Sequence, residues 1–311
     1  MKFSIIIPLY NGAKFIEQTL NSVLAQTYKN YEIILINDGS PDNVSEVVNG
    51  YFSKHPGVKY VYLEQKNKGL GGARNTAIQQ SSGEIIALLD QDDIWYPEKL
   101  EKVALAYEKM PHVSIVSHGI NIRNNGEIIR TDIDGPSAEN MHRALLFSGN
   151  LLSTPAVTFR RDVINVIGGF SEDINKYHLV EDYDLWLRMA LAGYRFYFLT
   201  DVLGEWTLHE SNFTKSMDRK MCESSINVLN LHYGLLKEKQ LFDWYRLRQI
   251  KARILYNMAD KLFFVLRAYG ASLVYLGRMI GSDPFSLFTL AISPLAKKSA
   301  RKLLKILQRS I

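Results

Sequence analysis

Short apolar runs alternate with helical patterns through the first third of the chain. Phe3–Leu9 is a continuous apolar run, which is typical of a strand covered on both faces. The segment Ile16–Leu24 then carries apolar side chains at helical spacing. The same alternation predicts strands at Tyr31–Ile36, Val58–Leu63 and Glu84–Leu89, and helices at Val44–Phe52, at about Leu70–Gln80, and from Pro97 to near Pro111. This rhythm predicts a Rossmann-like, mostly parallel sheet flanked by helices.

The pattern changes after Val113. Asn124-Asn125-Gly126 is a hairpin turn signal between two expected strands, Ile120–Arg123 and Glu127–Arg130. Further strands are expected near Ala156–Phe159, at Arg195–Leu199 and at Val202–Leu208, and further helices at Ala138–Phe147 and at about Glu181–Ala192. From about residue 215 the pattern is helical, so we expect an α/β domain over residues 1–214 and a helical C-terminal region over residues 215–311.

Composition narrows the class of protein. The 311 residues are 47% hydrophobic and 22% charged, which is ordinary for a soluble chain that buries a core. The single cysteine, Cys222, cannot form an internal disulfide, so nothing indicates an oxidising compartment. No stretch reaches the roughly 18 uninterrupted apolar residues that a spanning helix needs. We therefore expect a cytoplasmic protein that does not cross a membrane.

The net charge of +5 is modest, and we expect no nucleic-acid partner. The last residues nevertheless predict a helix with one basic face, formed by Lys298, Arg301, Lys302, Lys305 and Arg309, and one apolar face, formed by Ala300, Leu303, Leu304, Leu307 and Ile311. One interpretation is a helix that lies peripherally on the anionic inner surface of the cell membrane. The other is a terminal helix docked on the protein's own core. The periodicity fits both interpretations equally.

Two acidic turns follow buried strands. The second strand ends in Asn37-Asp38-Gly39-Ser40, and the fourth ends in Asp90-Gln91-Asp92-Asp93. Ligands of open α/β sheets bind beyond the carboxyl ends of the strands, so both turns are expected at one ligand-binding edge. Carboxylates gathered so closely repel one another, and a bound Mg²⁺ or Mn²⁺ relieves that repulsion. The alternative is an acidic turn that only caps the helix beginning at Pro97; the pairing of the two turns favours the metal.

A glycine-rich segment, Lys68–Asn75, lies between the third strand and a helix. Glycines let a backbone approach a ligand closely, and a helix N-terminus attracts anions, so this segment and Arg74 are candidates for contact with a diphosphate. The first strand ends in Pro8-Leu9-Tyr10-Asn11, without a glycine-rich turn, which counts against a nicotinamide or flavin enzyme. A tight loop would also explain the glycines, but it would not explain Arg74.

A third acidic site, Glu181-Asp182, opens a predicted helix. Carboxylates at this position are often only partners of the helix dipole. Adjacent helical residues point about 100° apart, so the two are not expected to act as a facing pair of carboxylates. One of them could serve as a single general base. Asp184 and Arg188 are expected to form an ordinary ion pair one helical turn apart.

Together these segments resemble the family-2 glycosyltransferases of the GT-A fold. The resemblance covers roughly the first 210 residues, and it depends on the ordered set of motifs more than on any one of them. The motifs are Ser4–Asn11, Ser22–Tyr28, Asn37–Ser40, Gly69 with Ala73–Asn75, Leu89–Asp93, Gly168–Phe170 and Glu181–Trp186. The resemblance implies a nucleotide-sugar half over about residues 1–112 and an acceptor half over about residues 113–214.

The resemblance also implies how a nucleotide-sugar donor is bound. Pro8, Tyr10 and Asp38 would line the nucleotide pocket, with Asp38 in contact with the base. Asp90 would face the ribose. The family often has Asp-Asp where this chain has Asn37-Asp38, so one charge is missing beside the pocket, which weakens the prediction of the donor base but not that of the fold.

The resemblance implies further roles in catalysis. Asp92, with Asp93, would hold Mn²⁺ or Mg²⁺ on the donor diphosphate. His209 matches a late histidine that in some relatives also reaches the metal, although a lone histidine is more often structural. Asp182 falls at the position of the catalytic base.

The sequence therefore predicts an inverting glycosyltransferase that moves a sugar, expected to be UDP-linked, to a hydroxyl of a saccharide or lipid-linked saccharide in cell-surface polysaccharide or glycolipid synthesis. Gly169 and Glu181 are candidates for the acceptor site, whereas Trp186 is expected in the core. One rival is a metal-dependent sugar-phosphate nucleotidyltransferase, which should carry a basic, glycine-rich loop after its first strand. The other is a non-catalytic carbohydrate-binding protein, against which the intact acidic motifs speak.

Overall fold

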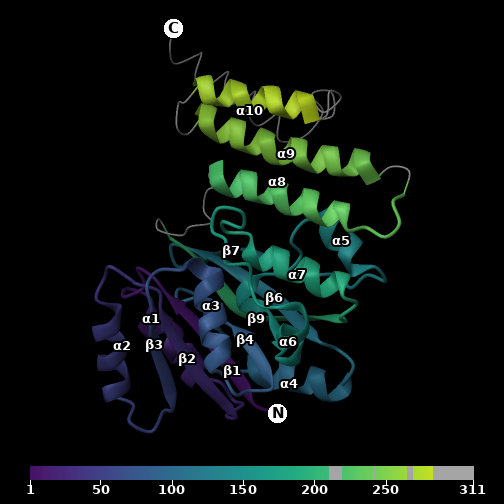
Figure 1. The fold of residues 1–311 in the computed structure, drawn as a ribbon. Coiled ribbons are helices and arrows are strands. Elements are labelled where there is room, and N and C mark those ends of the chain that lie inside the picture. Colours follow the sequence, from purple (N-terminus) through teal and green to yellow (C-terminus); the bar gives the residue numbers. More distant parts are fainter. Residues whose placement is uncertain (210–218, 241–242, 265–268, 283–311) are drawn as a thin grey trace. The chain divides into compact units, whose positions relative to one another are not determined.

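The computed structural model describes residues 1–209, 219–240, 243–264 and 269–282. The chain divides into two compact units, residues 1–215 and 216–311. The first unit holds the strands, and the described part of the second is helical (Figure 1). The expected separation of the first unit into a donor half and an acceptor half stays a prediction.

The first unit is built on one nine-stranded sheet, counted over the described residues. Its strands are β1 (Phe3–Leu9), β2 (Tyr31–Asn37), β3 (Tyr60–Glu64), β4 (Ile85–Leu88), β5 (Ile94–Trp95), β6 (Ile115–Asn124), β7 (Glu127–Asp132), β8 (Thr158–Arg160) and β9 (Phe196–Leu208). The spatial order is β3-β2-β1-β4-β8-β6-β9-β5, with β7 paired to β6.

Helices flank this sheet along the first unit. They are α1 (Ile16–Leu24), α2 (Val44–Ser53), α3 (Gly69–Gln80), α4 (Lys99–Lys109), α5 (Met141–Ser148), α6 (Asp162–Ile167) and α7 (Glu181–Leu191), with a short 3-10 helix, η1 (Thr154–Ala156), before β8. The predicted alternation of strand and helix over the first third of the chain is therefore confirmed. The short elements β5, η1 and α6 were not predicted.

Strands β3, β2, β1 and β4 are parallel, and β1 is buried along its whole length. Alternate side chains of β1, among them Phe3, Ile5 and Ile7, share one hydrophobic cluster with the apolar faces of α1, α2 and α4. Ile6 points to the opposite face because side chains alternate along a strand, and α3 covers that face (Figure 1). Cover on both faces is the reason these strands are continuously apolar.

The other half of the sheet is mixed. β8 runs antiparallel to β4 and to β6, whereas β9 runs parallel to β6 and antiparallel to β5. The two strands expected at Arg195–Leu199 and Val202–Leu208 are one long strand, β9. Its pairing with β6 shifts register between Ser117 and Asn121. The first of these shifts falls at residues 200–201 of β9, which separate the two expected strands.

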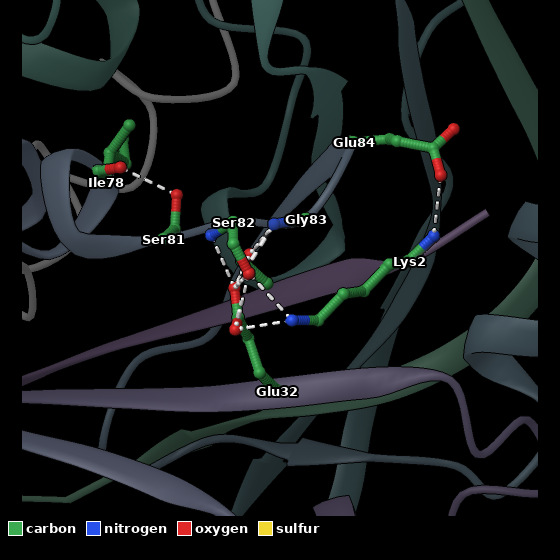
Figure 2. A network of polar contacts seen from close by, with 8 residues as sticks. Lys2, Glu32, Ile78, Ser81, Ser82, Gly83 and Glu84 are labelled. Carbon is green, nitrogen blue, oxygen red and sulfur yellow. Dashed lines mark hydrogen bonds and ion pairs between the residues drawn. The ribbon is translucent and has the colours of Figure 1, made fainter.

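A polar network ties β1 and β2 together at the edge of the sheet opposite to the acidic turns that follow β2 and β4. Figure 2 shows Glu32 of β2 facing Lys2 and the connection between α3 and β4. The Glu32 carboxylate accepts hydrogen bonds from Lys2 Nζ at 2.7 Å, Ser4 Oγ at 2.5 Å and the Ser82 backbone N–H at 2.6 Å. Burial works against the charge, but these hydrogen bonds outweigh it and lower the pKa of Glu32 to about 2.

The described part of the second unit contains α8 (Arg219–Gly234), α9 (Asp243–Phe264) and α10 (Tyr269–Ser282). A core that includes Cys222, Leu255 and Met279 joins the three helices. Within the ranges that the structure covers, no helix is long and apolar enough to cross a membrane. The predicted basic helix over residues 298–311 lies outside the described residues.

Candidate active site

The predicted donor residues follow the carboxyl ends of neighbouring parallel strands. Leu9 of β1 pairs with Asn37 of β2, and the Asp38 backbone N–H donates to the Leu9 carbonyl at 3.0 Å. β4 runs in the same direction beside β1, so Asp90 emerges at the same edge. The sheet thus brings both acidic turns together, which is the arrangement expected from strand direction.

Gln91 links the turn after β1 to the acidic loop after β4. Its side-chain nitrogen Nε2 donates to the Tyr10 carbonyl at 2.7 Å, and its Oε1 accepts from the Tyr10 backbone N–H at 2.9 Å. A Cβ at Gly12 would lie 1.9 Å from Gln91 Oε1, so glycine leaves room for this clamp. The sequence did not reveal the role of Gln91, because its partner, Tyr10, is 81 positions away.

Asp38 organises the loop that precedes α3. It is buried, and its Oδ1 accepts from Gln65 Nε2 at 2.6 Å and from the Lys68 backbone N–H at 2.8 Å. The carboxylate therefore fixes the approach of the chain to Gly69, where α3 begins. Its predicted contact with the donor base stays a prediction, as do those of Pro8, which is buried in β1, and Tyr10, which is half-buried.

Arg74 of α3 is buried and joins two carboxylates. Its Nη2 lies 2.8 Å from Asp90 Oδ1, and its Nη1 lies 2.8 Å from Glu181 Oε1. The guanidinium also lies over the ring of Phe170, 5.3 Å from its centre. With both terminal nitrogens engaged, this geometry favours a brace between the sheet edge and α7 over the direct diphosphate contact expected from the sequence.

The two acidic residues that open α7 have different surroundings. Glu181 is buried against Arg74, and burial raises its pKa to about 7. Asp182 is half-buried; its Oδ2 accepts from Thr154 Oγ1 at 2.7 Å and its Oδ1 from the Tyr183 backbone N–H at 2.6 Å. Burial also raises the pKa of Asp182. Asp182 is therefore the better placed of the two to meet a ligand, whereas the ion pair of Glu181 favours a structural role over the predicted acceptor contact.

Asp92 and His209 come together at the end of β9. His209 Nε2 lies 2.7 Å from Asp92 Oδ2, and its ring stacks on Phe15 with 4.1 Å between ring centres. Antiparallel pairing of β5 with β9 brings these positions, 117 residues apart, into contact. A carboxylate oxygen is a typical ligand of Mn²⁺, and an imidazole nitrogen is a common ligand of divalent transition metals.

The Asp93 side chain contacts the backbone of β9. It is buried, and its Oδ1 accepts from the Thr207 backbone N–H at 3.2 Å. This position favours a structural role over the metal-ligand role predicted from the sequence. In the part of the chain that the structure describes, no three or more His, Cys, Asp or Glu side chains are grouped as a metal site. Asp92 and His209 would therefore need substrate oxygens or water to complete a coordination shell, as Mg²⁺ sites usually do.

Gly169 lies against α3. A Cβ there would lie 2.2 Å from Asn75 Oδ1, and the same amide accepts from the Phe170 backbone N–H at 2.7 Å. Close packing thus explains this glycine, and its acceptor role stays a prediction.

Trp186 is fully buried beside Phe170, which confirms the expected core position. Asp184 and Arg188 form the expected ion pair, at 2.8 Å.

A curled, mixed sheet with flanking helices and an acidic edge at the ends of its parallel strands is the GT-A type of glycosyltransferase fold. The chain belongs to glycosyl transferase family 2, because the model of that family matches residues 4–168.

Proteins of similar sequence also carry the name glycosyltransferase. An uncharacterised glycosyltransferase of Nostoc is 34% identical over 172 residues, covering 54% of this chain and 53% of the relative. An uncharacterised glycosyltransferase of Rickettsia typhi is 32% identical over 225 residues, covering 68% and 66%. The chondroitin synthase of Escherichia coli is 30% identical over 193 residues, covering 61% and 26%. The chain thus spans between a quarter and two thirds of the length of these relatives.

Solved structures share the fold. Residues 1–349 of S. aureus TarS, in complex with UDP-GlcNAc, superpose with a TM-score of 0.65 at 22% identity, covering 91% of this chain and 81% of that one. A mannosyltransferase of Pyrobaculum calidifontis, in complex with GDP-Man and Mn²⁺, gives a TM-score of 0.62 at 19% identity, covering 93% and 87%. At these identities the likeness is one of fold.

Proposed function

We propose that this protein is an inverting glycosyltransferase that moves a sugar from a nucleotide-diphosphate donor to a hydroxyl acceptor. The observation that carries the proposal is the double ion pair of Arg74. This one guanidinium holds Asp90, at the donor edge of the sheet, and Glu181, the neighbour of Asp182, each at 2.8 Å. This connection supports a single site that contains both the candidate base and the candidate donor edge.

The donor side is assigned to the turns after β1, β2 and β4. Asp38 would face the base and Asp90 the ribose, with Pro8 and Tyr10 lining the pocket. The two structural neighbours bind UDP-GlcNAc and GDP-Man, which supports a nucleoside diphosphate sugar as the donor class. We assign a UDP-linked sugar.

Asp92 and His209, whose side chains lie 2.7 Å apart, would hold Mn²⁺ or Mg²⁺. When bound, such a cation neutralises the negative charge of a departing nucleoside diphosphate. The buried position of Asp93 makes it the weaker candidate of the predicted metal residues.

The proposed chemistry is a single displacement. The acceptor oxygen forms a bond to the anomeric carbon as the bond from that carbon to the phosphate oxygen breaks. The nucleoside diphosphate leaves with the electron pair. Asp182 takes the proton of the acceptor hydroxyl, and a well-placed base contributes typically ~10²–10⁴ in rate. Attack opposite to the leaving group inverts the configuration.

The acceptor is assigned to a saccharide or lipid-linked saccharide of a cell-surface polysaccharide or glycolipid. The relationship to the chondroitin synthase of Escherichia coli supports a sugar polymer as the product class. We place the protein in the cytoplasm, with peripheral contact at the inner membrane face through the basic C-terminal residues.

A thermal-shift screen of nucleotide sugars with Mn²⁺ would identify the donor, and NMR of the product made from it would give the anomeric configuration. Asp182→Asn should abolish transfer and preserve donor binding, because it removes only the proton acceptor. Near-normal turnover by this variant would reject the base assignment. Pyrophosphate release from a sugar phosphate and a nucleoside triphosphate would favour the rival nucleotidyltransferase.

A further inference from the structure

A short strap, defined here as residues 153–156, lies beside the candidate base. It precedes β8, and β8 runs antiparallel to β4 with Thr158 opposite Ala87. The strap therefore lies at the carboxyl end of β4, the edge from which Asp90 emerges. Its second residue, Thr154, donates its hydroxyl to Asp182 Oδ2 at 2.7 Å, across 28 positions of sequence.

The residues on either side of Thr154 are both held in place. The Pro155 carbonyl accepts from Trp95 Nε1 at 2.8 Å and from Lys99 Nζ at 2.9 Å, and both of these donors are buried. On the other side, Ser153 donates its backbone N–H and its hydroxyl to Asp134, at 2.8 Å and 3.0 Å. These bonds fix the backbone on both sides of Thr154, and with it the position from which the Thr154 hydroxyl reaches Asp182.

Trp95 and Lys99 lie two and six positions after the acidic loop Asp90–Asp93. One continuous segment therefore supplies donor-edge carboxylates and anchors the strap that contacts Asp182. Precise placement of reacting groups depends on such supporting contacts, since small displacements of a catalytic group cost large factors in rate.

We infer that Thr154 is a positioning residue that orients Asp182 and keeps its carboxylate ionised for proton abstraction. This inference rests on the proposed function, in which Asp182 is the base. A hydrogen bond donated to a carboxylate favours its charged form, whereas burial disfavours it. The Thr154 hydroxyl thus opposes the effect of burial on the pKa of Asp182, as does the Arg74 guanidinium, whereas the Asp90 carboxylate acts in the same direction as burial. Asp182 Oδ1 is already held by the Tyr183 backbone N–H, so the two bonds together fix the plane of the carboxylate.

The Tyr183 amide provides a test that needs no substrate. Its N–H donates to Asp182 Oδ1, so its NMR shift should report the titration of that carboxylate. With tyrosine labelled by ¹⁵N and the signal assigned through Tyr183→Phe, the midpoint in Thr154→Val should rise by about one pH unit, the value of one hydrogen bond to a charged group. Thr154→Ser, which keeps the hydroxyl, should restore the lower midpoint.

Ser153→Ala is the matched control, because it removes the neighbouring hydroxyl, which binds Asp134, while the Ser153 backbone N–H still holds the strap to Asp134. It should leave the Tyr183 titration unchanged. With the donor found by screening, Thr154→Val should lower kcat roughly tenfold, leave the KM for donor within about twofold, and move the acidic limb of the pH profile upward. Thr154→Ser should recover most of that kcat.

Different results would overturn the positioning role of Thr154 and the role of Asp182 as the base. An unchanged Tyr183 midpoint in Thr154→Val would overturn the inference, even if Asp182→Asn were inactive as proposed. A raised midpoint together with a fully active Asp182→Asn would instead reject Asp182 as the base, and with it the catalytic meaning of the Thr154 contact.

Discussion

Arg74 and Glu181, 107 positions apart in the sequence, form a buried ion pair with 2.8 Å between Nη1 and Oε1. Because the same guanidinium holds Asp90, the pair connects α3, the end of β4 and the start of α7. Buried ion pairs cost desolvation of both partners, and they are costly to break by removing only one of them. Arg74 therefore fixes the position of the start of α7 relative to the end of β4.

Replacing Arg74 by Met should destabilise the protein by about 3 kcal/mol, because two carboxylates lose their shared counter-charge. Urea unfolding followed by circular dichroism measures this change. Combining Arg74→Met with Glu181→Gln should recover part of the loss, since the buried acid then carries no charge. Strictly additive free energies of unfolding in the two single variants and the double variant would show that the pair is not coupled.

The strands and helices were largely predictable, because each carries its own periodic signal. The apolar runs of β1 and β2 are each sufficient evidence for a buried strand, whereas β5 has two residues and therefore no measurable period. The register shift in β9 could not be read from the sequence, since it depends on the pairing with β6.

The acidic positions of the site were predictable for a different reason. Strand direction alone brings Asp38 and Asp90 to one edge, and the resemblance to a family supplied Asp182. The partners of these carboxylates were not predictable, because contacts such as Thr154 with Asp182 depend on the antiparallel course of β8. The buried orientation of Asp93 likewise follows from the Thr207 backbone, 114 positions away.

Gln91→Leu should weaken donor binding roughly tenfold, since it removes two hydrogen bonds that set the turn after β1 against the acidic loop. Isothermal titration calorimetry with the donor found by screening gives the affinity. Gln80→Leu, at an exposed glutamine at the end of α3, is the matched control and should bind normally. Normal donor affinity in Gln91→Leu would show that the clamp on Tyr10 has no part in donor binding.

Asp92 and Asp93 should respond differently to the same substitution. Asp92→Asn should lose most of the dependence of nucleotide affinity on Mn²⁺, because the contact with His209 places Asp92 beside the expected cation. Asp93→Asn should retain that dependence and instead lower the free energy of unfolding by about 1–2 kcal/mol, because it weakens a buried hydrogen bond to the Thr207 N–H. Titrating Mn²⁺ against nucleotide affinity separates the two, and loss of the dependence only in Asp93→Asn would reverse the assignment.

Glu32 should contribute to stability in a defined range of pH. Its pKa is about 2 in the folded protein, below the ordinary value of 4.5, so the unfolded chain binds more protons between these values. The contribution is therefore present above about pH 4.5 and is lost as the pH falls towards 2. Allowing for solvent screening, we expect roughly 1–2 kcal/mol from it. Glu32→Gln should be less stable than the native protein at pH 7, and the gap should narrow between pH 5 and pH 3 in urea unfolding. Glu127→Gln, on the exposed strand β7, should show no such gap, and a pH-independent gap for Glu32→Gln would mean that its hydrogen bonds act without its charge.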